Sequence, residues 1–161
     1  MARPKSTAEQ GDRLVSKNKR ASFDYEISDT FEAGMALIGS EVRSLRQHSA
    51  DLTDAWVDID HRGEAWVRGM RIPPLAHAAF GHVDTRARKL LLHRAQIERL
   101  RGLVERDGMT LIATKCYFKN NLAKLEVAVA RGKKKYDKRQ SIKIKEADRE
   151  ATSAIRRARK N

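Results

Sequence analysis

The sequence lacks most features of secreted, membrane-anchored or disulfide-bonded proteins. Cys116 is the single cysteine, which excludes an intrachain disulfide and a cluster of thiolate metal ligands. No apolar run approaches the roughly 20 residues that a membrane span needs, and the first twenty residues lack the apolar core of a secretory signal. We therefore expect a protein of the reducing cytoplasm without a membrane anchor.

Recognisable catalytic and metal-binding patterns are also missing. The sequence has no glycine-rich phosphate loop and no nucleophile elbow. Its five histidines are scattered, and no two have the i,i+4 spacing of a helical metal site. Three neighbouring acids, Asp54, Asp58 and Asp60, leave a small nuclease open, although acids are common beside turns. We expect no cofactor, no metal ion and no enzymatic activity.

Charge is abundant and unevenly distributed. The formal net charge is +13, yet residues 21–130 carry fifteen basic and fifteen acidic side chains. The excess lies in residues 1–20, with net +4, and in residues 131–161, with net +9. Basic ends on a neutral body indicate a module that binds a polyanion, with nucleic acid as the first candidate. An anionic membrane is the alternative, but the tail has alanine where a membrane helix would carry large apolar residues.

The C-terminal tail begins with a strongly basic stretch. Residues 131–145 contain eight lysines and arginines and one acid, Asp137. Farther on, a helical stripe consists of Ala147, Ala151, Ala154, Ile155 and Ala158. Four alanines and one isoleucine bury too little to offset about 1–2 kcal/mol of backbone entropy per residue. The tail is therefore predicted to be disordered, or helical only against a partner.

Hydrophobic alternation in the body predicts a small antiparallel barrel. Strands are expected at residues 23–37, 55–59, 64–70, 109–118 and 122–130, with Gly34 as a bend or bulge and Asn120-Asn121 as a hairpin turn. Helices are expected after Ser40, as N-cap with Glu41 in the first turn, and over residues 94–107, and a loop over 75–85. The predicted organisation is a flexible arm over 1–17, a barrel over 18–131 and a tail over 132–161.

Two features of the body leave alternatives open. Trp56 and Trp66 lie in alternating strands, where packing is typical, and a stacking platform for a base is the alternative. Arg86, Arg88 and Lys89 precede an apolar triplet, so their cations either project from a fixed base or form the solvated edge of a buried segment. Arg43 is expected on the outward face of the first helix.

Four blocks of the sequence resemble the SsrA-binding proteins, also called small protein B. They are NKRASFDYEI at 18–27, FEAGMALIGSEVRSLR at 31–46, TRARKLLLH at 85–93 and GKKKYDKR at 132–139. The resemblance implies a mainly β fold, an oligonucleotide-binding-type barrel with two inserted helices. It also implies a monomer that binds the tRNA-like domain of transfer-messenger RNA and brings it to stalled 70S ribosomes for trans-translation. The tail would then occupy the decoding centre and messenger channel of the small subunit.

The same resemblance implies two sets of contact residues. The RNA-facing set, with the cations and the histidine of the matching blocks, is Asn18, Lys19, Arg20, Tyr25, Glu41, Arg43, Arg86, Arg88, Lys89, Leu91, His93 and Lys124. The ribosome-facing set is Gly132, Lys133, Lys134, Asp137, Lys138, Arg139 and Ile155. Glu41 would accept from base amino groups or a 2′-hydroxyl, and first-turn capping is its structural alternative. Asp84 departs from the family, which usually has proline there. A ribosomal structural protein that binds ribosomal RNA is the alternative function.

Overall fold

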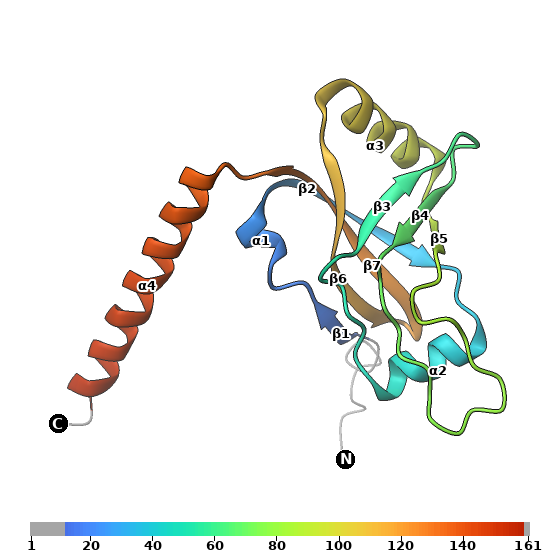
Figure 1. The fold of residues 1–161 in the computed structure, drawn as a ribbon, viewed down its shortest axis with the longest axis horizontal. Coiled ribbons are helices and arrows are strands. Elements are labelled where there is room, and N and C mark those ends of the chain that lie inside the picture. Colours follow the sequence, from blue (N-terminus) through green and yellow to red (C-terminus); the bar gives the residue numbers. More distant parts are fainter. Residues whose placement is uncertain (1–11, 160–161) are drawn as a thin grey trace, which may run out of the picture.

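The computed structural model describes residues 12–159 (Figure 1). Its strands are β1 (Arg13–Lys17), β2 (Tyr25–Met35), β3 (Trp56–Ile59), β4 (Ala65–Arg68), β5 (Arg88–Leu91), β6 (Thr110–Lys119) and β7 (Leu122–Gly132). Its helices are α1 (Ala21–Asp24), α2 (Gly39–Gln47), α3 (Arg94–Asp107) and α4 (Lys135–Ala158).

Six antiparallel strands close into a barrel. Hydrogen-bonded neighbours follow the order β6, β3, β4, β5, β2 and β7, and β7 pairs back with β6. β1 adds to β6 beside β3, where Arg13 pairs with Phe118 and Lys17 with Lys115. Closure leaves no long unpaired edge that could recruit another chain. The predicted mainly β, closed antiparallel barrel is confirmed.

The core fills the barrel and its two ends. Val67, Leu125, Val127 and Val129 are fully buried from the strands. Leu45 from α2 and Leu100 from α3 are also fully buried, and the two helices lie at opposite ends of the barrel (Figure 1). A smaller cluster of Ala21, Ile112, Ala128 and Ala130 packs under α1 on the outer face.

Several local predictions are confirmed. α3 spans the expected residues and ends at Gly108, whose φ of 62° is the left-handed conformation that favours glycine. Asn120 and Asn121 both have positive φ, as a tight hairpin turn requires. The 75–85 segment forms no helix or strand.

Other predictions are wrong. Arg13–Lys17 is a strand, not part of a flexible arm, and the rest of that arm, residues 1–11, lies outside the described residues. The strand expected from Phe23 begins at Tyr25, because α1 occupies the residues before it. β5 is an additional strand. The register shift in β2 falls between Ile27 and Asp29, so Gly34 is not the bulge. Ile38, not Ser40, is the N-cap of α2.

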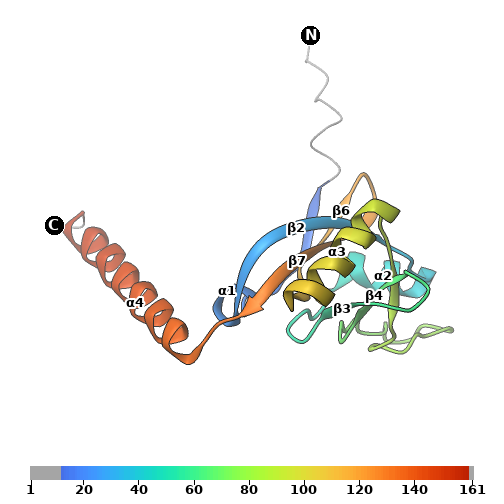
Figure 2. The same cartoon turned by 90° about the horizontal axis from the view of Figure 1, so that it is seen from above.

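The tail is a helix, α4, that projects away from the barrel in both views (Figures 1 and 2). Most of its side chains are exposed along its whole length. The helical tail is therefore confirmed, whereas its dependence on a partner stays a prediction.

Candidate nucleic-acid interface

Four predicted RNA-facing residues surround one hollow on the barrel. Lys89, Leu91, His93 and Lys124 line a depression of about 700 Å³. Gly34 is their common neighbour, because it pairs with Leu91 of β5 on one side and with Lys124 of β7 on the other. A Cβ at Gly34 would lie 3.3 Å from the Leu91 Cβ, so glycine keeps this row of side chains close-packed. Leu91 is 56% exposed, so the hollow combines an apolar surface with the two lysines Lys89 and Lys124.

The cations of this hollow differ in availability. Lys89 Nζ lies 2.7 Å from a carboxylate oxygen of Glu64, whereas the side chain of Lys124 makes no hydrogen bond or ion pair within residues 12–159. Nearby Glu32 accepts from Tyr117 and from Lys119 at 3.2 Å. The hydrogen bond from Tyr117, together with Lys119 and the charge of Lys124, lowers the pKa of Glu32. Within residues 12–159, Lys124 is therefore the lysine of this hollow whose ammonium group has no carboxylate partner.

A second group gathers at α1. Asn18 Nδ2 donates to the carbonyls of Leu52 (2.9 Å) and Ala113 (3.2 Å), and its Oδ1 accepts from the amides of Arg20 and Ala21. These contacts occupy the Asn18 side chain, so it shapes the turn that leaves Lys19 and Arg20 exposed. Asn18, Arg20 and Tyr25 line a groove of about 330 Å³.

The base of the tail is fastened to the same short helix. The Lys133 amide donates to the Asp24 carbonyl at 3.0 Å, and its Nζ donates to the Ser22 carbonyl at 2.9 Å. Lys138 Nζ lies 3.2 Å from the Asp24 carboxylate, and Gly132 pairs with Tyr25 in the sheet. The residues predicted to face RNA at α1 and those predicted to face the ribosome therefore meet at this junction.

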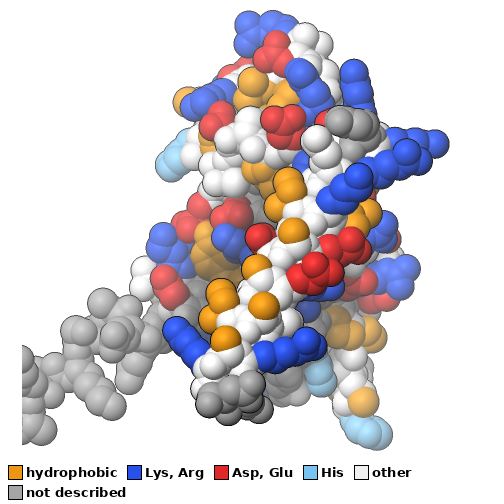
Figure 3. All heavy atoms as spheres, turned by 90° about the vertical axis from the view of Figure 1, so that its left-hand side faces the viewer, with side chains coloured by type: hydrophobic (Ala, Val, Ile, Leu, Met, Phe, Trp, Pro, Cys, Tyr) orange, Lys and Arg blue, Asp and Glu red, His pale blue; other side chains and the backbone are white. Residues whose placement is uncertain are grey.

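The helix itself explains the lone acid of the basic stretch. Lys134 is the N-cap of α4, and Asp137 lies in the first turn, where the helix dipole favours a negative charge. Farther along, Ile144 and Ile155 are 64% and 58% exposed, and hydrophobic side chains follow one face of α4 (Figure 3). Arg139 is exposed nearer the start of the helix. α4 thus presents exposed cations and an apolar stripe. Within residues 12–159, the stripe packs against no part of the barrel.

Glu41 and Arg88 do not project toward a ligand, and this corrects the prediction for both. The two side chains are fully buried and ion-paired at 2.8 Å. Arg88 also donates to the carbonyls of Met70 (2.8 Å) and Asp84 (2.9 Å), and Arg86 donates to Glu41 at 2.7 Å. The cluster joins α2, the end of β4 and the loop before β5, so its role is structural.

Hydrogen bonds keep the Glu41 carboxylate charged inside the protein. Burial alone would raise the pKa of Glu41, but donors from Arg86, the Ile38 amide and Arg88, with the charge of Arg88, outweigh it and lower the pKa. The Ile38 amide donates at 3.1 Å, which is the capping contact that the sequence left as an alternative. Arg86 remains partly exposed above the pair.

Arg43 lies apart from both surface groups. It is exposed on α2 and lines a hollow with Gln47, His48 and the loop at His77. The predicted RNA-facing set therefore falls into three places on the surface, the Lys89–Lys124 hollow, the α1 junction and the Arg43 end, and one buried pair with the partly exposed Arg86 above it.

Metal-binding, membrane-spanning and catalytic features are the other chemistry that the sequence predicts to be missing. Within residues 12–159 no group of three histidine, cysteine or acidic side chains is arranged to hold a metal ion. None of the helices in that range is long and apolar enough to span a membrane. Asp58 pairs with Arg68, and Asp60 accepts from two turn amides and from Trp66 Nε1, so both acids serve local structure. Burial raises the pKa of Cys116 to about 12, so its thiol stays protonated and the side chain packs as a small apolar group.

Comparison with known proteins identifies the family of this chain. The family model described as SmpB protein matches residues 15–157. The chain belongs to the SmpB family. An SsrA-binding protein of Sorangium cellulosum is 51% identical over 152 residues, which cover 94% of this chain and 93% of that protein. One from Bifidobacterium longum (strain DJO10A) is 46% identical over 151 residues, covering 93% and 96%.

A solved SmpB-family structure has the same fold. It is described as "tmRNA-SmpB: a journey to the center of the bacterial ribosome" and superposes with a TM-score of 0.63 at 42% identity. The match covers 76% of this chain and 86% of that one. The SmpB fold therefore accounts for the barrel.

Three residues that build these surfaces were not among the site residues predicted from the sequence. Asp24 anchors the tail through its carboxylate and its carbonyl. Gly34 sets the spacing of the Lys89–Lys124 hollow, and a glycine within a strand pattern is a usable signal for such close approach. Trp56 is 45% exposed, whereas the alternation of its strand favoured a packed side chain and left an exposed stacking platform as the alternative.

Proposed function

We propose that this protein binds transfer-messenger RNA and delivers it to stalled ribosomes for trans-translation. The observation that carries the proposal is the near full-length identity to SsrA-binding proteins, 51% over 94% of this chain. The charge distribution agrees physically, because the barrel is neutral overall and the excess of lysine and arginine lies at its ends.

The two functions are assigned to different parts of the molecule. The Lys89–Lys124 hollow and the α1 junction hold folded RNA, through Lys19, Arg20, Lys89, Leu91, His93 and Lys124. The tail contacts the decoding centre and messenger channel, through Gly132, Lys133, Lys134, Asp137, Lys138, Arg139 and Ile155. Glu41 and Arg88 support the fold beneath the loop that carries Arg86. The protein acts as a cytoplasmic monomer without a cofactor, and it is a binding protein, not an enzyme.

The RNA that accompanies the purified protein tests this function. We expect one discrete small RNA, identified by sequencing as transfer-messenger RNA, and only a substoichiometric amount of ribosomes. A ribosomal structural protein would instead remain stoichiometric with ribosomal RNA, and a nuclease would degrade added RNA. Either result would overturn the proposal.

Replacing Lys124 with alanine is expected to weaken RNA binding in a salt-dependent way. Each phosphate contact contributes about 0.7–0.9 to the slope of log K against log salt concentration, so the slope should fall by that amount. Lys119→Ala is the matched control, because Lys119 lies near the same hairpin and is already 3.2 Å from Glu32. The assignment of Lys124 fails if both variants keep the slope of the unaltered protein in filter-binding titrations.

A further inference from the structure

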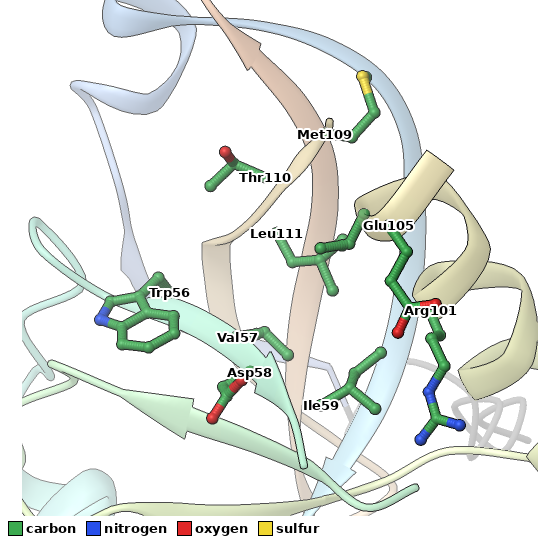
Figure 4. Close-up of a pocket in the computed structure, with 10 residues that line it drawn as sticks. Trp56, Val57, Asp58, Ile59, Arg101, Glu105, Met109, Thr110 and Leu111 are labelled. Carbon is green, nitrogen blue, oxygen red and sulfur yellow. The ribbon is translucent and has the colours of Figure 1, made fainter. Parts of the chain in front are cut away.

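An apolar pocket opens between the barrel and α3. It has a volume of about 250 Å³ and is bordered by β3, the C-terminal half of α3 and the start of β6 (Figure 4). Val57 and Leu111 form its buried floor, with exposures of 5% and 2%. Trp56 lies on one side of the pocket, and Arg101 and Glu105 of α3 lie on the other (Figure 4). The volume is below the 300–1,000 Å³ of drug-sized sites, which suits one small aromatic group.

The polar groups at the rim are only partly engaged. Arg101 uses one Nη to donate to the Asp60 carbonyl at 3.2 Å. Across the described part of the chain, the Glu105 side chain makes no hydrogen bond or ion pair, and the Trp56 indole nitrogen lies on the side of the ring away from the pocket (Figure 4). A pocket with an apolar floor, one aromatic wall and both donors and acceptors at its edge matches an unstacked nucleobase, which has a π face and a polar edge.

The pocket adjoins a surface already assigned to RNA. Trp56 and Thr110 line both this pocket and the groove that contains Asn18 and Arg20. Backbone pairing of Trp56 with Arg68 on one side and Ile112 on the other fixes the position of the indole between them. A nucleotide whose phosphate contacts Arg20 therefore has Trp56 as its next neighbour.

We propose that the pocket under α3 receives one unstacked base of the bound RNA, which stacks on Trp56 and meets Arg101 and Glu105 with its polar edge. This inference rests on the proposed RNA-binding function and adds a base-reading subsite to it. Phosphate contacts alone position an RNA without reading it, whereas a base in a pocket makes binding depend on an unpaired nucleotide at that place.

Fluorescence of a single tryptophan tests the contact directly. The chain has two tryptophans, so Trp66→Phe leaves Trp56 as the sole emitter. Titration with transcribed transfer-messenger RNA should quench its emission and shield it from acrylamide. In the matched variant, Trp56→Phe, the remaining Trp66 should show neither change. Unaltered acrylamide access to Trp56 in the saturated complex would overturn the subsite.

Affinity gives an independent readout. Loss of one stacked base should weaken RNA binding about tenfold in Trp56→Ala, with less loss in Trp56→Phe, which keeps an aromatic face. The salt slope should stay unchanged, because stacking releases no counterions, whereas Arg20→Ala should lower it. Equal affinity of Trp56→Ala and the unaltered protein would refute the subsite alone; failure of the unaltered protein to bind would refute the proposed function as well. Self-association that disappears in Trp56→Ala would identify a second copy as the occupant and also overturn the subsite.

Discussion

Replacing Glu41 with alanine is expected to lower the free energy of unfolding by about 3–5 kcal/mol, the cost of removing one partner of a buried ion pair. Glu41 and Arg88 are both fully buried, and Arg88 would keep its charge without a carboxylate. Denaturant titration followed by circular dichroism measures the change. RNA affinity, measured at a temperature where the variant is folded, should stay near that of the unaltered protein, because the Glu41 side chain has no exposed surface.

Glu64→Ala is the matched control for this experiment. Glu64 also holds a cation at 2.7 Å, in Lys89, but its side chain is 34% exposed and that of Lys89 is 40% exposed. An exposed pair is worth about 0–1 kcal/mol. Similar losses in the two variants would contradict the structural role of the buried pair. Folded Glu41→Ala protein that fails to bind RNA would restore Glu41 to the RNA contacts.

The pH dependence of stability follows from the same carboxylate. Because the pKa of Glu41 is lowered by folding, its contribution is present above the ordinary glutamate value of 4.5. That contribution is lost as the pH falls through the lower, native pKa. The unaltered protein should therefore lose stability in acid more steeply than a Glu41→Gln variant.

The burial of Arg88 was readable in part from the sequence. In β5, Arg88 and Leu90 lie on one face and both are buried, so the alternation could have indicated an inward Arg88, which was instead predicted to face RNA. Its positive charge favours exposure instead, because a buried arginine needs a carboxylate partner. Its partner, Glu41, lies 47 residues earlier, and no local pattern links the two.

The missed strands have the same cause. RLVSK at β1 is short and has no clear alternation, and it becomes a strand by pairing with β6 about 100 residues later. Ser16 donates to the Ala50 carbonyl and Arg13 to the Arg46 carbonyl, which fix it from another direction. By contrast, α3 and the β6–β7 hairpin carry their own period and turn residues, so both were predictable.

The candidate site was predictable as a set of residues but not as an arrangement. Composition located the basic ends, and the family resemblance selected Lys124 and Leu91. Neither indicated that Gly34 of β2 would lie between them, with Leu91 on β5 at one side and Lys124 on β7 at the other, or that α1 would hold the base of the tail. These are long-range contacts, which the closing of the barrel creates.

α1 links the two parts of the molecule physically. Asp24 contacts Lys138 of α4 through its carboxylate, while Arg20 lies 3.6 Å from the same group. RNA bound at Arg20 would thus be separated from Lys138 of the tail by the Asp24 side chain. Through Asp24, α1 therefore joins Arg20, which is proposed to contact RNA, to the start of α4.

Ending the chain after Lys134 is expected to abolish tagging of stalled nascent chains while leaving RNA affinity nearly unchanged. This end point keeps all of β7 and the Lys133–Asp24 contact, both of which belong to the folded body. It removes α4, which an exposed ion pair of Lys138 with Asp24 at 3.2 Å joins to that body, so little stability should be lost. Tagging is measured with ribosomes halted on a message without a stop codon, and RNA affinity by titration of transfer-messenger RNA.

Lys138→Ala is the control that separates the helix from its attachment. It breaks the exposed ion pair and keeps the apolar stripe and the remaining cations, so tagging should decrease modestly and persist. The truncated chain should also keep the salt slope of the full-length protein toward free RNA, because its cations at Lys19, Arg20, Lys89 and Lys124 remain. A truncated chain that loses RNA affinity would show that α4 binds the RNA itself, and one that still supports tagging would show that the ribosome is engaged by the barrel alone.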